Sequence, residues 1–341
     1  MKICLYLEFY HFLNGTLFNE MGTGILSSYE NQKAMLARMG IPFVEKWNDS
    51  CDILQTNSVW PSSFFLVRKA KKHNKKVIIF THITAEDFSR FFRFKPLDFV
   101  ATKVLKKYLS YFYGLADVLL CPSEYTRNLL LTYGLPERKM AVQSNGVDTD
   151  KFFPSSEERQ KTRENMNLRG VVVGTVGIVI PRKGVKTFLT LAQKFQTYQF
   201  IWFGRIFPKL FVKPLPQKMP RNIEFTGYVK DINAAYNALD IFLFPSYEEN
   251  QGMVLLEASA VGLPILVRDI PAYEGWLIHN ENCLKAKTNE EFEQFLAQLI
   301  KDENLRKRLG KKAGELAEKH KLENVGRNLK AVYTQLLVLG L

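Results

Sequence analysis

Short apolar runs alternate with segments of helical periodicity along the whole chain of 341 residues. This alternation is typical of α/β proteins, in which strand–helix units build a parallel sheet with helices on both faces. One hydrophobic core rarely supports a chain of this length, so we predict two Rossmann-like, doubly wound domains. The predicted strands are Lys2–Leu7, Ile53–Thr56, Lys76–Thr81 and Val118–Cys121 in the first half, and Val171–Val176, Gln199–Phe203, Asn222–Thr226, Ile241–Pro245 and Pro264–Val267 in the second.

The predicted domain boundary lies at the segment Asn145-Gly146-Val147-Asp148, which precedes a proline-containing turn and a strongly charged stretch. We therefore assign residues 1–148 to an N-terminal domain and residues 149–322 to a C-terminal domain. A helix with an apolar stripe is predicted over Ile25–Met39. Residues 323–341 also carry apolar side chains at helical spacing, and this C-terminal helix is expected to pack back onto the first domain.

Cysteine usage and hydropathy limit the class of protein. The cysteines lie far apart without CxxC spacing, mostly in apolar runs, so we expect buried thiols in a reducing compartment. The first apolar run is interrupted by Glu8 and His11 and is interpreted as a strand instead of a signal peptide. No uninterrupted apolar stretch reaches the roughly 18 residues that a membrane-spanning helix needs.

The chain is strongly basic, with a formal net charge of +13 and a pI near 9.4. This charge indicates a polyanionic partner, which could be a nucleic acid, an acidic membrane surface or a phosphorylated substrate. The distribution of the charge along the chain has to decide among them.

The most specific pattern joins a predicted strand to a helix through Pro245–Gly252, and it carries two glutamates. Gly252 allows a close approach of the backbone, and the free N–H groups of the helix that follows can hold a phosphate. Glu257 follows Glu249 by eight positions, so a loop carboxylate and a helix carboxylate can face one elongated ligand. Taken alone, the pattern also fits two solvated glutamates near a helix start.

These residues resemble the paired-glutamate motif of the retaining GT-B glycosyltransferases of group 1, or family 4. The resemblance extends over nearly the whole chain through Asn145-Gly146-Val147-Asp148, Phe225-Thr226-Gly227-Tyr228-Val229, Ala238-Leu239-Asp240 and Gly262-Leu263-Pro264. It implies two Rossmann-like domains that face a central cleft, with the nucleotide-sugar donor bound by the C-terminal domain and the acceptor by the N-terminal domain. It also implies that Glu249 contacts the transferring sugar and Glu257 the ribose, and that Tyr228 contributes to the donor site.

The resemblance further implies cationic and backbone groups that hold the donor diphosphate, whose negative charge grows as the glycosidic bond breaks. Lys183 occupies the expected lysine position, whereas Ile178 stands where the family usually has arginine, so Arg182 or Arg205 would replace it. The alternative is an ordinary basic turn. The backbone groups expected at the diphosphate belong to Met253 and Val254 and to the glycine turn with Gly22 and Gly24 before the first long helix.

His82 follows a predicted strand at the edge where α/β proteins bind ligands, so we expect it to contact a sugar or acceptor hydroxyl. A structural role is the usual alternative for a lone histidine. Asp148-Thr149-Asp150 imitates a metal-binding Asp-x-Asp pair, but it begins inside the boundary segment, and no cluster elsewhere offers metal ligands. We therefore predict no metal site and no tightly bound cofactor; a divalent cation could stimulate such an enzyme, but the fold does not require one.

Positive charge concentrates between Arg68 and Lys107, where aromatic residues are interleaved with it. Cations beside bulky apolar rings suit an anionic lipid surface. We expect membrane contact over the segment 88–95, through Phe88, Arg90, Phe91, Phe92, Arg93 and Lys95. In the helix that follows, Leu97, Val100, Val104, Tyr108 and Phe112 are instead interpreted as a core face with solvated lysines opposite.

This pattern is similar to the bacterial diacylglycerol glycolipid synthases of the family, which add a sugar to a glycolipid at the membrane. The resemblance implies a UDP-hexose donor, galactose or glucose with galactose favoured, a monoglucosyldiacylglycerol acceptor and an α-linked product. It also implies a peripheral enzyme on the cytoplasmic face of the membrane that binds anionic lipids and no nucleic acid. The alternatives are a transferase for a soluble or polysaccharide acceptor, and a non-catalytic basic protein that binds membrane or nucleic acid.

Overall fold

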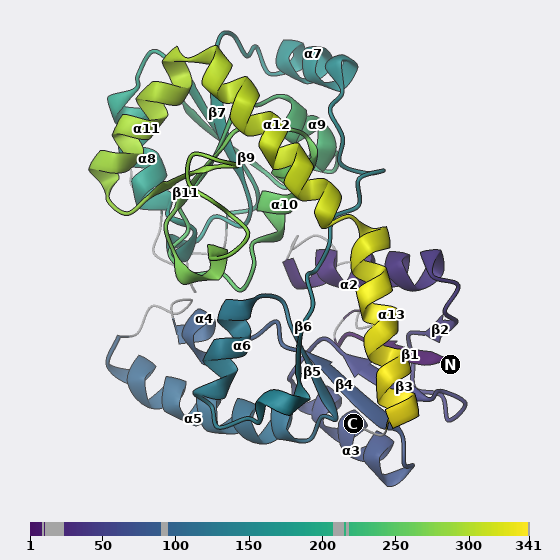
Figure 1. The fold of residues 1–341 in the computed structure, drawn as a ribbon. Coiled ribbons are helices and arrows are strands. Elements are labelled where there is room, and N and C mark those ends of the chain that lie inside the picture. Colours follow the sequence, from purple (N-terminus) through teal and green to yellow (C-terminus); the bar gives the residue numbers. More distant parts are fainter. Residues whose placement is uncertain (9, 11–23, 90–94, 207–214, 216–217, 340–341) are drawn as a thin grey trace. The chain divides into compact units, whose positions relative to one another are not determined.

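The computed structural model describes the whole chain except residues 9, 11–23, 90–94, 207–214, 216–217 and 340–341 (Figure 1). Its contacts divide the chain into two compact units. The described residues of unit 1 lie between Met1 and Gly146 and from Leu322 onward, and unit 2 contains Val147–Lys321. The chain thus passes from unit 1 to unit 2 within the segment expected to form the boundary, and it returns to unit 1 at its last helix.

Unit 1 contains a parallel sheet in the order β2-β1-β3-β4-β5-β6. Its strands are β1 (Ile3–Tyr6), β2 (Phe43–Val44), β3 (Ile53–Thr56), β4 (Lys76–Phe80), β5 (Val118–Cys121) and β6 (Met140–Val142). The helices are α2 (Gly24–Arg38), α3 (Pro61–Lys72), α4 (Ala85–Ser89), α5 (Lys95–Gly114), α6 (Glu124–Leu131) and α13 (Leu322–Leu339). The strand order reverses between β1 and β3, so the carboxyl ends of these strands border the ligand-binding edge typical of such sheets.

Two hydrophobic cores cover the two faces of this sheet. One core packs α3, α5 and α6 against it. The other packs α2 and α13, with Val325, Leu329 and Tyr333 of α13 almost fully buried. Gly326 allows the two helices to approach, because a Cβ there would lie 3.4 Å from the Cβ of Met35. The last helix of the chain is therefore an integral part of the core of unit 1.

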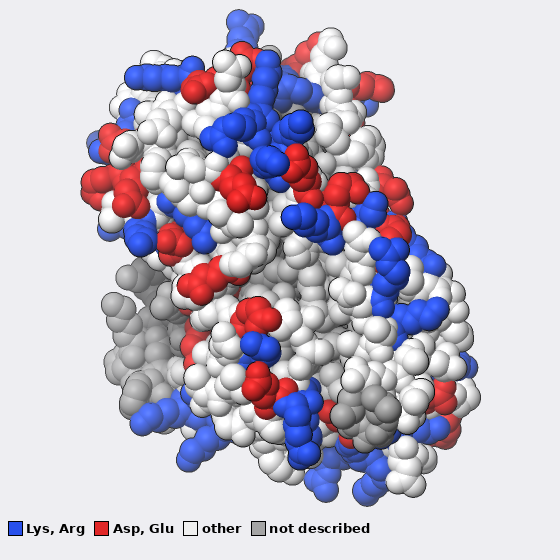
Figure 2. Space-filling model, in the orientation of Figure 1, with Lys and Arg blue, Asp and Glu red and all other residues white. Residues whose placement is uncertain are grey.

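The interpretation of the α5 stripe as a core face is wrong for Val100 and Val104, and the side chain of Leu97 lies outside the described residues. Phe112 is fully buried, but the side chains of Val100 and Val104 are 60% and 62% exposed. The helix is 20 residues long, and its C-terminal half is the part that packs in the core. In Figure 2, Lys and Arg side chains gather along the lower edge of unit 1, where Figure 1 places α5 and α3.

Unit 2 contains a second parallel sheet in the order β12-β11-β10-β7-β8-β9. Its strands are β7 (Val172–Val176), β8 (Gln199–Phe203), β9 (Ile223–Gly227), β10 (Ile241–Phe244), β11 (Ile265–Arg268) and β12 (Leu284–Ala286). The helices are α7 (Ser156–Asn165), α8 (Val185–Lys194), α9 (Ile232–Asn237), α10 (Met253–Ala260), α11 (Asn289–Lys301) and α12 (Glu303–Lys319). Counted from β7, this is the Rossmann order, with its reversal between β7 and β10. The predicted doubly wound fold of both domains is confirmed.

Candidate functional site

The loops that leave β7 and β10 meet at the point where the strand order of unit 2 reverses. The two strands are hydrogen-bonded neighbours, and ligands of doubly wound sheets bind outside the carboxyl ends of such a pair. The loop after β7 carries Arg182 and Lys183, and the loop after β10 carries Glu249. The Tyr247 N–H donates to the carbonyl of Arg182 at 2.9 Å, which fixes one loop against the other.

Gly184 makes this close approach possible. It caps the N-terminus of α8 with φ of 80°, in the left-handed region that favours glycine. A Cβ added to Gly184 would lie 2.2 Å from the carbonyl oxygen of Pro245. The lack of a side chain at this position therefore lets the basic loop reach the acidic one.

Glu249 lies at the centre of the resulting polar cluster. Its Oε1 accepts hydrogen bonds of 2.6 Å from both Lys183 Nζ and Ser246 Oγ, and Arg182 Nη1 lies 3.6 Å away. Arg182 also donates to the main-chain carbonyl of Glu248. Only 8% of the Glu249 side chain is exposed. Burial alone would raise the pKa of Glu249, but the charges of Lys183 and Arg182 and the two hydrogen bonds outweigh it and hold the pKa below its ordinary value.

Glu257 is equally buried, at 7% exposed, but no cation contacts it among the described residues. Tyr236 donates a hydrogen bond of 2.6 Å from its hydroxyl to Glu257 Oε2. Burial raises the pKa of Glu257, and the Tyr236 hydrogen bond and the more distant charge of Lys151 offset only part of the rise. The structure thus places the two motif glutamates in different surroundings within one unit.

Helix α10 begins at Met253, between the two glutamates in sequence, and Met253 and Val254 form its N-terminus. Its N-cap, Gly252, has φ of 85° and supplies no capping side chain, and the first turn contains no acidic residue. Helix N-termini with this composition attract anions through their N–H groups and the helix dipole. These properties make the start of α10 suitable for a phosphate group.

Arg268 supports the acidic loop through contacts with Pro245 and Tyr247, and the sequence motifs did not reveal this role. The residue is 8% exposed at the end of β11. Its Nε donates to the Pro245 carbonyl at 3.2 Å and its Nη2 to Thr187 Oγ1 at 3.0 Å. The guanidinium carbon lies 4.1 Å from the centroid of the Tyr247 ring. The sequence offered one signal, because Arg268 directly follows an apolar run. An arginine at such a position is buried, and a buried cation needs several hydrogen-bond acceptors.

Ser246 and Tyr236 were also missed as partners of the glutamates. Ser246 lies three positions before Glu249, and its hydroxyl reaches the carboxylate only because the loop between them turns back. The sequence does not show this turn. Tyr236 reaches Glu257 from α9, and the two residues lie 21 positions apart. Neither pairing leaves a periodic pattern in the sequence.

His82 lies at the carboxyl edge of the unit 1 sheet, just after β4. Its ring stacks on Phe80, with the ring centroids 4.3 Å apart. The Nε2 atom lies 3.1 Å from Asn57 Oδ1 and 3.4 Å from Ser28 Oγ. An amide oxygen can only accept, so this contact is a hydrogen bond only in the tautomer that carries the proton on Nε2. Burial lowers the pKa of His82 to about 3, and the imidazole is neutral at physiological pH.

The other predicted site residues are placed unevenly. Gly24 is the first residue of α2, and Tyr228 follows β9 with 49% of its side chain exposed. Arg205 follows β8, and its carbonyl accepts from the Val179 N–H at 2.9 Å, which places its backbone beside the loop after β7. Gly22 and the core of the predicted membrane segment, residues 90–94, lie outside the described residues. The backbones of Phe88 and Lys95 belong to α4 and α5, but their side chains are not described.

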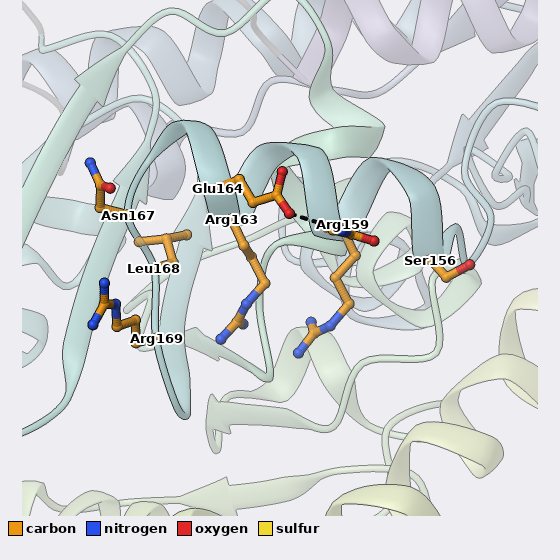
Figure 3. Close-up of a pocket in the computed structure, with 8 residues that line it drawn as sticks. Ser156, Arg159, Arg163, Glu164, Asn167, Leu168 and Arg169 are labelled. Carbon is orange, nitrogen blue, oxygen red and sulfur yellow. Dashed lines mark hydrogen bonds between the residues drawn. The ribbon is translucent and has the colours of Figure 1, made fainter.

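A basic hollow of about 460 Å³ borders α7 (Figure 3). Arg159 and Arg163 line it, and both bind the carboxylate of Asp240, at 2.6 and 3.0 Å. They also donate to main-chain carbonyls before β10. These arginines therefore anchor α7 to the rest of unit 2, where both pair with the Asp240 carboxylate.

Two features are absent from the described part of the chain. Within it, no group of three or more His, Cys, Asp or Glu side chains is arranged to hold a metal ion. None of its helices combines the length and the apolar character that crossing a membrane demands. All four cysteines are free and buried, as expected.

Two family models match the chain. Residues 156–316 match Glycosyl transferases group 1, and residues 28–151 match Glycosyltransferase Family 4. The processive diacylglycerol alpha-glucosyltransferase of Acholeplasma laidlawii is 30% identical over 348 residues, covering 99% of each chain. The alpha-galactosylglucosyldiacylglycerol synthase of Streptococcus pneumoniae is 27% identical over 241 residues, covering 67% of this chain and 64% of that protein.

Solved structures agree on the fold. Anabaena HepE in complex with UDP and glucose has a TM-score of 0.79 at 15% identity, covering 98% of this chain and 99% of HepE. WaaG, a glycosyltransferase involved in lipopolysaccharide biosynthesis, has a TM-score of 0.71 at 16% identity, covering 97% and 98%. At these identities the likeness concerns the fold alone. The full-length relative and the two family models show that this chain is a glycosyltransferase of group 1 with the GT-B fold.

Proposed function

We propose that this enzyme transfers a hexose from a UDP-sugar to a diacylglycerol glycolipid, with retention of the α configuration. The single observation that carries the proposal is the cluster of Glu249, Lys183 and Arg182 at the strand-order reversal of unit 2. The names of the two relatives given above supply the acceptor class. One is named as a glucosyltransferase and the other as a galactosylglucosyldiacylglycerol synthase, so both sugars remain candidates for the donor.

In this proposal, Lys183 and Arg182 bind the donor diphosphate together with the N–H groups of Met253 and Val254. Lys183 Nζ has three donors, so it can retain Glu249 while it binds a phosphate oxygen. The four groups concentrate positive charge where the leaving group develops negative charge. The glycine turn with Gly22 and Gly24 remains a proposed further source of backbone donors to the diphosphate.

Glu249 would accept hydrogen bonds from hydroxyls of the transferred sugar, because its carboxylate is kept ionised and still has Oε2 available for a ligand. Glu257 would bind the ribose hydroxyls, with Tyr236 holding its Oε2 in place. Tyr228 is exposed and would pack against the donor. His82, which is neutral, would exchange a hydrogen bond with a sugar or acceptor hydroxyl without adding charge.

The proposed reaction breaks the bond between the sugar C1 and the β-phosphate oxygen. The acceptor oxygen forms its bond to C1 on the face that the leaving group vacates, which preserves the α configuration. The acceptor proton passes to the departing phosphate oxygen, whose charge Lys183, Arg182 and the α10 N-terminus stabilise. The cations of the chain thus take the role that a metal ion has in other transferases, although a divalent cation could still stimulate the reaction.

We further propose that the enzyme binds the cytoplasmic face of the membrane peripherally, where its acceptor lies. Phe88, Arg90, Phe91, Phe92, Arg93 and Lys95 remain proposed lipid contacts. Cations and aromatic rings in one short segment suit the headgroup region of an anionic membrane.

The direct test incubates purified enzyme with labelled UDP-glucose or UDP-galactose and vesicles that contain monoglucosyldiacylglycerol. We expect an α-linked diglycosyldiacylglycerol with one of the two donors, identified by mass spectrometry and by its anomeric NMR signal. Transfer only to a soluble oligosaccharide, or a β-linked product, would contradict the proposal. Absence of UDP binding in calorimetry would contradict the donor class.

A further inference from the structure

Gln55 places a long polar side chain inside the core of unit 1. It belongs to β3, an inner strand of the sheet, and its side chain is fully buried. Gln32 of α2 and Tyr333 of α13 are buried as completely, and they reach Gln55 from the two helices that cover one face of the sheet. Buried polar side chains cost stability unless hydrogen bonds satisfy them. These three residues therefore need partners within the core.

The partners form a chain of hydrogen bonds that ends at His82. The Tyr333 hydroxyl donates to Gln55 Oε1 at 2.6 Å, and Gln55 Nε2 donates to Gln32 Oε1 at 2.7 Å. Gln32 Nε2 donates to Asn57 Oδ1 at 2.8 Å. That oxygen lies 3.1 Å from Nε2 of His82. The four residues Tyr333, Gln55, Gln32 and Asn57 constitute the amide relay, which joins the last helix of the chain to His82.

The order of donors and acceptors fixes which atom of Asn57 faces the ring. A carboxamide has its oxygen on one side and its nitrogen on the other, so the amides of the relay must point the same way. Gln32 Nε2 has a second acceptor in Ser28 Oγ, at 3.0 Å. The Ser28 hydroxyl donates its one hydrogen to Asn145 Oδ1 at 2.6 Å, so it can only accept from Gln32. The nitrogen of Gln32 therefore faces Asn57, and the oxygen of Asn57 faces His82.

Nε2 of His82 thus lies near two oxygens that can only accept from it. They are Asn57 Oδ1 at 3.1 Å and Ser28 Oγ at 3.4 Å, and an N–H satisfies them where a lone pair would repel them. Asn57 keeps this orientation although its Nδ2, on a side chain that is 1% exposed, has no hydrogen-bond partner among the described residues. A buried donor without a partner costs stability. The contacts of Oδ1 therefore outweigh the missing partner of Nδ2.

The carboxylates around His82 are held by other groups. Glu8, after β1, accepts from the N–H groups at the start of α3, and Glu86 of α4 accepts from the Tyr133 hydroxyl. Asp87 lies on the same helix as Glu86. None of these charges contributes to the pKa of His82, which burial alone lowers. Among the described residues, the ring is therefore opposed by neutral groups.

We propose that the amide relay positions His82, because it holds the ring neutral with the proton on Nε2 and the lone pair on Nδ1. An imidazolium, or the other tautomer, would carry a hydrogen on Nδ1 instead. The effect on catalysis rests on the proposed contact between His82 and a sugar or acceptor hydroxyl, since a lone pair can accept from a hydroxyl and an N–H cannot. Tyr333 makes the C-terminal helix a part of this arrangement.

The direct readout is nitrogen NMR of the imidazole rings in the full chain, which contains five histidines. His82→Gln identifies the signals of His82 by their absence. At neutral pH we expect the wild type to show a protonated Nε2 and an unprotonated Nδ1. A proton on Nδ1 would mean that the relay runs in the opposite direction and would overturn the proposal.

Tyr333→Phe removes the first donor of the amide relay and keeps the aromatic ring. The amides are then no longer fixed from this end, so His82 should show both tautomers, and kcat should fall by about fivefold. Tyr29→Phe is the matched control, because its buried hydroxyl donates to the Leu5 carbonyl at 3.0 Å in the same core, outside the relay. It should lose similar stability but keep the tautomer and kcat. An unchanged tautomer in Tyr333→Phe, or a mixture in both variants, would overturn the relay.

Asn57→Asp tests the neutrality of the ring. A carboxylate beside His82 favours the imidazolium, so the pKa of His82 should rise from about 3 toward or above its ordinary value of 6.5. Transfer should then change with pH in that range, where the wild type shows no step from this residue. Asn48→Asp adds the same charge at an exposed position of unit 1 and should keep the pH profile of the wild type. A pKa that stays near 3 in Asn57→Asp would contradict the contact between residue 57 and the ring.

The NMR experiments need no substrate, so they separate this inference from the proposed function. The expected tautomer in a protein that transfers hexose from no UDP-sugar would refute the proposed function and leave the relay intact. Wild-type kcat in a Tyr333→Phe protein whose His82 shows both tautomers would refute the positioning role and leave the proposed transfer intact.

Discussion

Glu249 and Glu257 belong to one loop–helix segment and are buried to the same degree, yet their surroundings shift their pKa values in opposite directions. Glu249 receives two hydrogen bonds, one of them from a lysine, and lies near Arg182. Glu257 receives a hydrogen bond from a phenol. The comparison shows that the spacing of a motif fixes where carboxylates lie, whereas residues outside the motif set the direction in which their pKa values shift.

Of the substitutions at the two glutamate sites, Glu249→Gln should have the largest effect on stability and on transfer. The amide keeps the volume but leaves Lys183 and Arg182 without a carboxylate, so the free energy of unfolding should fall by about 3 kcal/mol. Transfer should fall by roughly 10²–10³-fold, measured as kcat with a saturating UDP-sugar. Glu248→Gln is the matched control, because Arg182 contacts the main-chain carbonyl of that residue. Comparable activity in the two variants would contradict a special role for Glu249.

Gly184→Ala tests the approach that brings Lys183 to Glu249. The added Cβ would lie 2.2 Å from the Pro245 oxygen, and φ is 80°, so the loops must separate. We expect a loss of about 2–3 kcal/mol in the free energy of unfolding, and a weaker affinity for UDP.

Gly170→Ala supplies the control for Gly184→Ala. Its φ is 61°, and an added Cβ meets nothing within 4 Å. Only the backbone strain should remain, at about 1 kcal/mol. Equal losses at Gly184 and Gly170 would show that the contact with Pro245 is unimportant.

A smaller effect is expected for Tyr236→Phe, which removes the hydroxyl that binds Glu257 at 2.6 Å and lies 3.4 Å from the Val254 carbonyl. Loss of the hydrogen bond to a buried carboxyl should cost about 1–2 kcal/mol in stability and weaken UDP binding about tenfold. Tyr273→Phe is the matched change, because the buried hydroxyl of Tyr273 has no hydrogen-bond partner among the described residues. Its stability should stay within about 0.5 kcal/mol of the wild type. Calorimetry with UDP and urea unfolding measure both quantities.

The inner strands of both sheets were predicted from sequence, whereas of the four edge strands only β9 was predicted. Ile53–Thr56, Val118–Cys121 and Gln199–Phe203 were predicted to the residue. The second and third of these are almost continuous apolar runs, as expected for a strand buried on both faces. The three missed strands, β2, β6 and β12, lie at the sheet edges and contain two or three residues. Segments this short have no period that would distinguish them from a loop.

The candidate site was predictable only in part, for a related reason. The position of Glu249 follows from a local pattern and that of Lys183 from the resemblance to the family, but Tyr236 and Arg268 join the site through tertiary contacts. The α5 stripe is a second case in which the sequence pattern lacked the tertiary information. Its periodicity correctly indicated that Val100 and Val104 share a face, but periodicity does not reveal whether another element covers that face.

The two glutamates should also differ in how pH acts on them, and here the effects are smallest. Glu249 has a lowered pKa in the folded protein, so its stabilising contribution is lost as the pH falls below its ordinary value of 4.5. Glu257 has a raised pKa, so its contribution is present below 4.5 and is lost as the pH rises from there. One titrating proton changes the free energy of unfolding by at most about 1.4 kcal/mol per pH unit.

Glu257→Gln removes that titration without changing the volume. The stability of the variant relative to the wild type should therefore increase as the pH rises above 4.5, because the wild type alone loses stability there. For Glu249→Gln, the stability deficit should shrink as the pH falls below 4.5. Urea unfolding at a series of pH values gives both differences, and other titrating groups cancel between wild type and variant. If the stability differences of Glu249→Gln and Glu257→Gln from the wild type change in the same pH range and with the same sign, the two carboxylates have similar surroundings in solution. The proposed contrast between the cationic surroundings of Glu249 and the phenolic surroundings of Glu257 would then be wrong.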